Sequence, residues 1–235
     1  MKRYSRTNRF WQSVASAVAI MLIASCNSKT VQATETVSKN NNGDVLVGST
    51  FNIGETGPGG GVVFAVSNNG ANGLEFAPEV LSGDHIAWGC SKVDLDDIPN
   101  LTGFFDPVVQ LKPNEEVQSG SLNSKALAKD AQQACSSPAA QAAMSYTTTP
   151  RGDEAADAKE FTDWYLPSIE ELLQIARLKF EVPLVSNEFN ELITPSLWSS
   201  TEHTNEIAWF LLPDGSASIG HKDLSAIAVL PVRSF

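Results

Sequence analysis

Apolar runs and polar breaks alternate along residues 51–235, with Gly, Pro and Asn separating the runs. Residues 61–66 form a continuous apolar run rich in Val and bounded by Gly and Asn, which predicts a buried strand. Residues 74–77 follow after a short Asn/Gly turn, so we expect them to pair with the first strand as a hairpin. Apolar runs separated by turn residues in this way are typical of one globular domain.

Two segments have the spacing of amphipathic helices. In residues 122–134 the apolar side chains fall on one face of a helix; they are Leu122, Ala126, Leu127, Ala131 and Ala134. A second helix is predicted to begin at Ser168, because Ser168 and Glu171 have the spacing of a capping box. The residues after Glu171 continue an apolar stripe at helical spacing, and Pro183 sets its latest end.

The last part of the chain again favours strands. We expect strands in residues 198–201, 207–212, 216–221 and 226–235, with a Pro-Asp-Gly turn at residues 213–215. Strands therefore come first and last, with helices between them. This order predicts an α+β fold with an antiparallel sheet that both ends of the domain are free to join.

The N-terminal segment predicts export. It has four basic residues and no acidic one before a short apolar run that ends at Ala24, Ser25 and Cys26. A positive region, a short apolar region and small residues are typical of a secretory signal peptide, and the end resembles the lipobox of bacterial lipoproteins. We therefore expect residues 1–25 to be removed and Cys26 to carry the lipid that anchors the chain to a membrane.

Residues 26–50 are predicted to hold the lipidated cysteine and a flexible polar tether. Their polar, low-complexity sequence lacks aromatic residues and offers little apolar surface to bury. Asn27 follows the cysteine, and lipoproteins retained in the inner membrane commonly have Asp there. The expected location is thus the cell envelope, with the outer membrane favoured if the cell is Gram-negative.

The charge of the chain disfavours nucleic acid as a partner. Removal of the leader takes four of 16 basic residues and no acidic one, which leaves 12 basic against 27 acidic residues and a formal charge of −15. Such a surface repels phosphates and anionic headgroups. No pattern of residues predicts a cofactor or a metal site.

Cys90 and Cys135 are the cysteines that remain after lipidation of Cys26. Two thiols in an exported chain most simply pair as a disulfide, whereas a redox-active pair or metal ligands need close spacing or nearby His. A disulfide that closes a loop of this many residues stabilises the folded state by about 4 kcal/mol in the chain-entropy model.

Seven short strings in a fixed order resemble the DUF1566 family, the type of domain at the C-terminus of the Legionella collagen-like adhesin. They are GPGGGVVFAV (57–66), GLEFAPE (73–79), AWGC (87–90), DWYLPSIEEL (163–172), WSSTE (198–202), AW (208–209) and LPVRSF (230–235). The resemblance implies a C-type-lectin-like fold over residues 51–235 and a role as a surface adhesin. The chain departs from the namesake in lacking a collagen-like repeat. Relatives often have Arg at the position of Leu230, so Arg233 is here the only Arg of the closing strand. Its acidic surface is a poor match for a sulfated polymer.

The residues within these strings have mainly structural interpretations. The glycines of residues 57–61 precede a strand and lack the helix and Lys of a phosphate loop, so a turn into the strand is favoured. Trp164, Trp198 and Trp209 are expected in the core and not as platforms for sugars. The ligand-binding candidates are the remaining polar residues near the strings, namely Asp163, Glu202, His203 and Asn205.

Three functions fit this sequence. The first is a surface binding module for glycan or protein, whose binding face would combine residues 88–146 with residues 202–206. The second is an envelope enzyme, since C-type-lectin-like folds include the formylglycine-generating oxidases, but the chain has no catalytic motif that supports it. The third is a scaffold that binds other envelope proteins.

Overall fold

A computed structural model of the chain describes residues 34–39, 45–82, 86–95, 119–131, 135–149, 160–181, 192 and 194–235. Contacts divide the chain into two units, Met1–Thr30 and Val31–Phe235. The predicted signal peptide and Cys26 fall in the first unit and lie outside the described residues. In the part of the chain that the structure describes, no helix is both long enough and apolar enough to cross a membrane.

Strands β1 (Thr34–Lys39) and β2 (Val45–Thr50) form an antiparallel pair in which Val37 lies opposite Val47. The sequence predicted a flexible polar tether over residues 26–50; within that range the structure describes only residues 34–39 and 45–50, and these have extended, paired backbone. The reason is local, because Thr and Val favour extended backbone. The connection between the strands has five residues, which is a common length for a hairpin.

The first three-stranded sheet has the order β3-β4-β8. Strands β3 (Val62–Ser67) and β4 (Asn72–Phe76) form the predicted hairpin through the short 3₁₀ turn η1 (Asn68–Gly70). Strand β8 (Val232–Ser234) pairs antiparallel with β4, so the prediction that both ends of the domain join one sheet is confirmed. β8 is shorter than the predicted strand over residues 226–235, since Pro231 has no N–H to donate to a ladder.

The second sheet has the order β5-β6-β7, formed by Leu197–Glu202, Ile207–Leu211 and Ala217–His221. Every residue of β5 is buried. Leu197 and Trp198 belong to two different core clusters, as do Trp209 and Ala208 on β6. This alternation follows from the two-residue period of a strand and shows that both faces of the sheet are covered.

The described residues form three helices in the middle of the chain, so the α+β fold class is correct. They are α1 (Ser119–Ala131), α2 (Pro138–Met144) and α3 (Ile169–Glu181). Helix α1 begins three residues before the predicted start, and Leu122 is 67% exposed although the pattern had placed it on the buried face. Helix α2 was not predicted, although Ser137 accepts a hydrogen bond from the Ala140 amide and so provides its N-cap.

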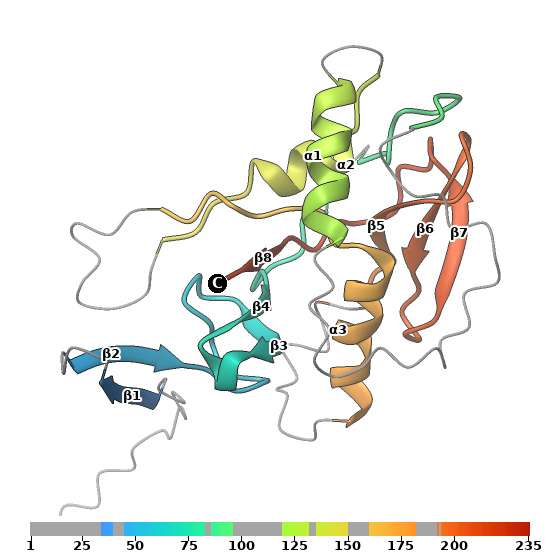
Figure 1. Cartoon of the computed structure of the whole chain (residues 1–235). Helices are drawn as coiled ribbons and strands as arrows, with labels where there is room; N and C mark the ends of the chain where they lie inside the picture. The colour runs from blue at the N-terminus through green and yellow to red at the C-terminus, as the bar shows by residue number, and fades with distance from the viewer. Residues whose placement is uncertain are drawn as a thin grey trace, which may run out of the picture. The chain divides into compact units, whose positions relative to one another are not determined.

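Helix α3 packs between the two three-stranded sheets (Figure 1). Its apolar residues share one core cluster with Phe76 of β4 and Leu211 of β6. A second cluster joins α1 and α2 to the other face of the β5-β6-β7 sheet, with Trp88 and Trp198 at its centre. Trp164, Trp198 and Trp209 are at most 7% exposed, so the expectation that they are core residues is confirmed.

The capping box at the start of α3 is confirmed. The Glu171 amide donates to Ser168 Oγ at 3.2 Å, and the Ser168 amide donates to Glu171 Oε2 at 2.7 Å. Glu171 is fully buried and also accepts a hydrogen bond from the Tyr165 hydroxyl at 3.0 Å. Burial raises the pKa of Glu171 to about 8, against the hydrogen bonds from Ser168 and Tyr165, which lower it.

Candidate functional site

The glycine-rich turn before β3 holds the carboxylate of Glu75. The Gly59 amide donates to Glu75 Oε1 at 2.8 Å, and the Gly61 amide donates to Oε2 at 3.0 Å. A Cβ on Gly59 would lie 2.7 Å from Glu75 Oε1, so a side chain there would displace the carboxylate. The predicted turn into the strand is therefore confirmed, and its amides bind an anion that belongs to the protein itself.

Arg233 joins this carboxylate to Asp163. Its Nη1 donates to Glu75 Oε1 at 2.6 Å, while Nε and Nη2 donate to the two oxygens of Asp163 at 2.8 and 3.1 Å. The guanidinium carbon also lies 4.2 Å from the centre of the Phe161 ring. Glu75 is fully buried, whereas the Asp163 side chain is 55% exposed. Burial raises the pKa of Glu75, and the contacts with Arg233 oppose this rise.

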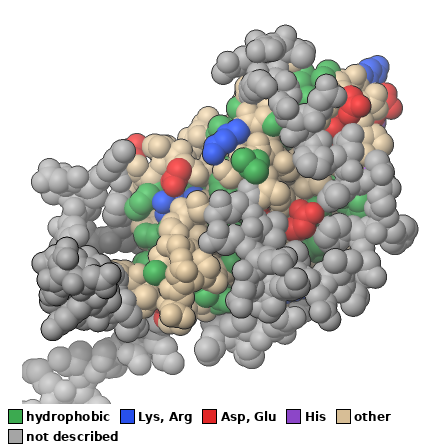
Figure 2. Space-filling model, viewed as in Figure 1, with side chains coloured by type: hydrophobic (Ala, Val, Ile, Leu, Met, Phe, Trp, Pro, Cys, Tyr) green, Lys and Arg blue, Asp and Glu red, His purple; other side chains and the backbone are tan. Residues whose placement is uncertain are grey.

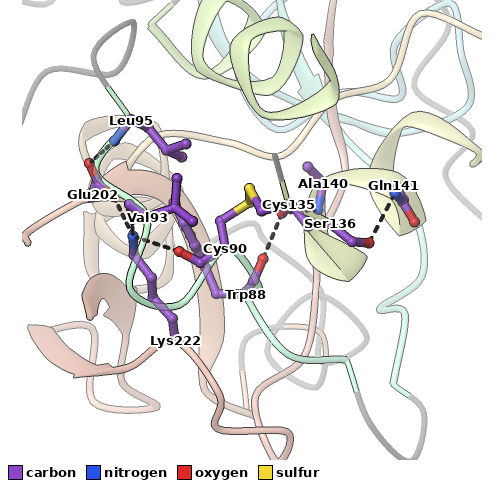
Figure 3. Close-up of a disulfide and its surroundings, with 11 residues drawn as sticks. Trp88, Cys90, Val93, Leu95, Cys135, Ser136, Ala140, Gln141, Glu202 and Lys222 are labelled. Carbon is purple, nitrogen blue, oxygen red and sulfur yellow. Dashed lines mark hydrogen bonds and ion pairs between the residues drawn. A yellow bond between two sulfur atoms is a disulfide. The ribbon is translucent and has the colours of Figure 1, made fainter. Parts of the chain in front are cut away.

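A second buried ion pair joins β5 to the residue after β7. Lys222 Nζ donates to Glu202 Oε1 and to the Val93 carbonyl, and both charged side chains are fully buried (Figure 3). The ammonium also lies 4.6 Å from the centre of the Trp88 ring. Burial lowers the pKa of Lys222 and raises the pKa of Glu202, while the ion pair opposes both shifts. Glu202, a ligand candidate in the sequence, thus has an internal partner.

The predicted disulfide between Cys90 and Cys135 is present, with an S–S distance of 2.01 Å. It connects the loop of residues 86–95 to the segment that leads into α2 (Figure 3). The Cys90 amide donates to the Ser136 carbonyl at 3.0 Å, and Ser137 Oγ donates to the Trp88 carbonyl at 2.6 Å. The disulfide and these two hydrogen bonds therefore hold residues 88–90 against residues 135–137.

Indole hydrogen bonds attach this loop to the second sheet. Trp88 Nε1 donates to the Ser199 carbonyl at 2.7 Å, and Trp198 Nε1 donates to the Ile86 carbonyl at 3.1 Å. The Lys92 amide donates to the Asn205 carbonyl at 2.8 Å. Two parts of the predicted binding face, residues 88–95 and 202–206, thus lie against each other.

Two of the four ligand candidates belong to the ion networks and two do not. Asp163 contacts Arg233, and Glu202 contacts Lys222. His203 is half-buried, with its ring edge-on to Trp209 at 5.4 Å, and Asn205 is exposed on the turn that holds Lys92. The sequence missed Glu75 and Lys222, although a single charge inside an apolar strand, as at Glu75, is a usable signal of a buried ion pair.

A hollow of about 300 Å³ opens beside the first network. It is lined by the Gly59–Gly60 turn, by Pro78 and Glu79 after β4, and by residues 146–149 after α2. The Tyr146 ring lies edge-on to Trp164 at 5.2 Å, and Thr148 exchanges two backbone hydrogen bonds with Phe161. Thr148 Oγ1 is buried and has no hydrogen-bond partner among the described residues.

Neither a metal site nor a basic patch is evident in what the structure describes. Across the described ranges, no three His, Cys, Asp or Glu side chains form a group that would hold a metal ion. On the face in Figure 2, the Lys and Arg side chains of these residues lie apart from one another. No protein-family model and no curated protein matches the chain.

Proposed function

We propose that this chain is a lipid-anchored bacterial envelope protein whose body, residues 51–235, binds a glycan or protein ligand. The body would be a DUF1566-type domain with a C-type-lectin-like fold. The seven strings quoted above support this assignment. The sheet β3-β4-β8 also supports it, since that fold brings its N- and C-terminal strands into one sheet.

The observation that carries the proposal is the rigid attachment of irregular loops to the two sheets. Loop 86–95 is fastened by the Cys90–Cys135 disulfide, by hydrogen bonds from Lys222 Nζ to the Cys90 and Val93 carbonyls, and by the Lys92–Asn205 hydrogen bond. Loops held on a rigid scaffold are a common way to present a binding surface, because little conformational entropy is lost when the ligand binds.

The state of the buried charges favours binding over catalysis. Glu75, Glu202, Lys222 and Arg233 each have a charged partner within the protein, and Glu171 caps α3. Groups engaged in this way hold segments together and are poorly placed to exchange protons with a substrate. The oxidases that share the C-type-lectin-like fold rely on reactive cysteines, and here Cys90 is 4% exposed and bonded to Cys135.

The binding function is tested with an array of glycans and extracellular matrix proteins. The probe is the mature chain with Cys26→Ser, which is free of lipid, and circular dichroism checks that it is folded. We expect a reproducible subset of ligands to bind. A folded protein that binds nothing on the array would overturn the binding function.

The anchor is tested separately on the native protein. Mass spectrometry should find a chain that begins at Cys26 and carries acyl groups, and labelled palmitate should be incorporated by the wild type but not by Cys26→Ser. An intact leader or an unmodified Cys26 thiol would overturn the membrane location and leave the binding test unaffected.

A further inference from the structure

The hollow between the glycine turn and residues 146–149 has walls rich in hydroxyl groups. Tyr146, Thr147, Thr148 and Thr149 follow one another there, and Glu79 supplies a carboxylate. Each hydroxyl is both a donor and an acceptor of hydrogen bonds. Walls of this kind suit a ligand that also carries several hydroxyl groups.

The described residues around the hollow disfavour an anionic ligand. No Lys, Arg or His is among the described residues of its lining. The two glycine amides of the lining are already used, because the Gly59 amide binds Glu75 and the Gly60 amide binds the Gly57 carbonyl. The Arg233 guanidinium is held by Glu75 and Asp163. A sulfate or carboxylate would therefore meet Glu79 without a compensating positive charge from these residues.

Thr147 and Thr149 provide the points of attachment. Both are exposed residues of the lining. They flank Thr148, whose backbone is fixed by two hydrogen bonds to Phe161, while its Oγ1 is buried and does not reach a ligand in the hollow.

The Tyr146 ring adds an ordered apolar surface. Its edge-on contact with Trp164, which is 2% exposed, fixes the orientation of the ring before any ligand arrives. A fixed ring beside hydroxyl groups matches the two surfaces of a pyranose, which has C–H groups on its faces and hydroxyl groups at its rim. The volume of about 300 Å³ is at the small end for ligand sites and suits one ring, not a longer segment.

We propose that this hollow binds a single neutral sugar ring, either free or as one unit of a longer glycan. The proposal rests on the binding function above and specifies its ligand class and location. The hydroxyls of Thr147 and Thr149 accept or donate hydrogen bonds to sugar hydroxyls, and Tyr146 packs against the ring.

The test measures binding of glucose, galactose and N-acetylglucosamine to the mature Cys26→Ser chain, with glucose 6-sulfate as the anionic probe. Saturation-transfer NMR detects contact, and tyrosine and tryptophan fluorescence gives the affinity. We expect at least one neutral sugar to bind with a dissociation constant of about 1–10 mM. Glucose 6-sulfate should bind at least tenfold more weakly than the best neutral sugar.

Matched threonine variants locate the site. Thr147→Val keeps the shape of an exposed side chain of the lining and should weaken binding about 3- to 10-fold, the effect of one neutral hydrogen bond. Thr149→Val, the other exposed threonine of the lining, is the second variant should Thr147→Val unfold, and it should weaken binding in the same direction. Thr162→Val is the control, because Thr162 is exposed and outside the lining, and it should leave binding unchanged.

Three results would overturn the hollow as a sugar site. They are no binding of any neutral sugar, equal or tighter binding of glucose 6-sulfate, and binding that neither threonine variant of the lining changes. If the array of the preceding section is positive while one of these results holds, the binding function stands and its surface lies elsewhere. If the array and all three neutral sugars are negative, both proposals fall.

Discussion

Replacement of Arg233 by Met tests whether the first ion network holds the domain together. The substitution keeps a long apolar side chain and removes the guanidinium that joins β8 to β4 and to Asp163. Glu75 would remain 0% exposed, with only the Gly59 and Gly61 amides to balance its charge. The consequence should therefore be dominated by an uncompensated buried carboxylate.

The expected loss of unfolding free energy is about 3–5 kcal/mol, the usual effect of removing one partner from a buried ion pair. This is a large part of the 5–15 kcal/mol that stabilises a typical domain. Asp163→Asn is the matched control. It removes the charge of another partner of Arg233, but the Asp163 side chain is 55% exposed. It should cost about 1 kcal/mol or less, since water screens that contact.

The loss should also depend on pH in a defined direction. Burial raises the pKa of Glu75 above its ordinary value of 4.5, and loss of Arg233 removes a contact that lowers it. A carboxyl whose pKa is raised on folding contributes its full stability below pH 4.5 and loses it as the pH rises through the folded pKa. The difference between wild type and Arg233→Met should therefore be larger at pH 7.5 than at pH 5.

Urea unfolding followed by tryptophan fluorescence measures these differences, because Trp164 lies close to the network. The double variant Glu75→Gln with Arg233→Met should recover part of the stability, since no charge is then buried without a partner. A loss below 1 kcal/mol at pH 7.5, or the same loss at pH 5 and pH 7.5, would refute the structural role assigned to Arg233.

Two further predictions concern α3 and loop 86–95. Burial raises the pKa of Glu171 to about 8, so its contribution to stability should decline as the pH rises from 4.5 to 8. Urea unfolding across this range should show that decline in the wild type and not in Glu171→Gln. The same pH dependence in both proteins would contradict the prediction. The double variant Cys90→Ala with Cys135→Ala should lose about 4 kcal/mol, because the disulfide closes a separation of 45 residues. Hydrogen exchange should become faster first at residues 86–95 and not in α3, and a uniform increase would argue against a local role of the disulfide.

The sequence predicted those features that depend on neighbours in the chain. The Ser168–Glu171 box needs only a spacing of three residues, and both of its hydrogen bonds are present. The hairpin of β3 and β4 follows from two apolar runs with a short turn between them. The signal for α2 was also local, with Ser137 as N-cap and Pro138 at the first turn, and it was overlooked.

The site residues depend on partners that are distant in the sequence, which no local pattern specifies. Glu75 and Arg233 are 158 residues apart, and Asp163 and Arg233 are 70 apart. Glu202 looked like an accessible ligand group because it ends a polar string, but Lys222, 20 residues later, reaches it inside the protein. The direction of each side chain is set by tertiary packing, so charge alone did not distinguish a structural group from a binding group.

The two ion networks explain why the strings of the sequence occur together. The turn at residues 57–61, Glu75, Asp163 and Arg233 come from four different strings and meet in one network. AWGC and WSSTE supply Trp88, Cys90 and Glu202 to the other, where Lys222 joins them. The polar groups of these strings are thus largely occupied in joining distant segments. Recognition of a ligand must then fall to groups that the networks leave accessible, such as the hydroxyls of the exposed Thr147 and Thr149, which lie next to the first network without being part of it.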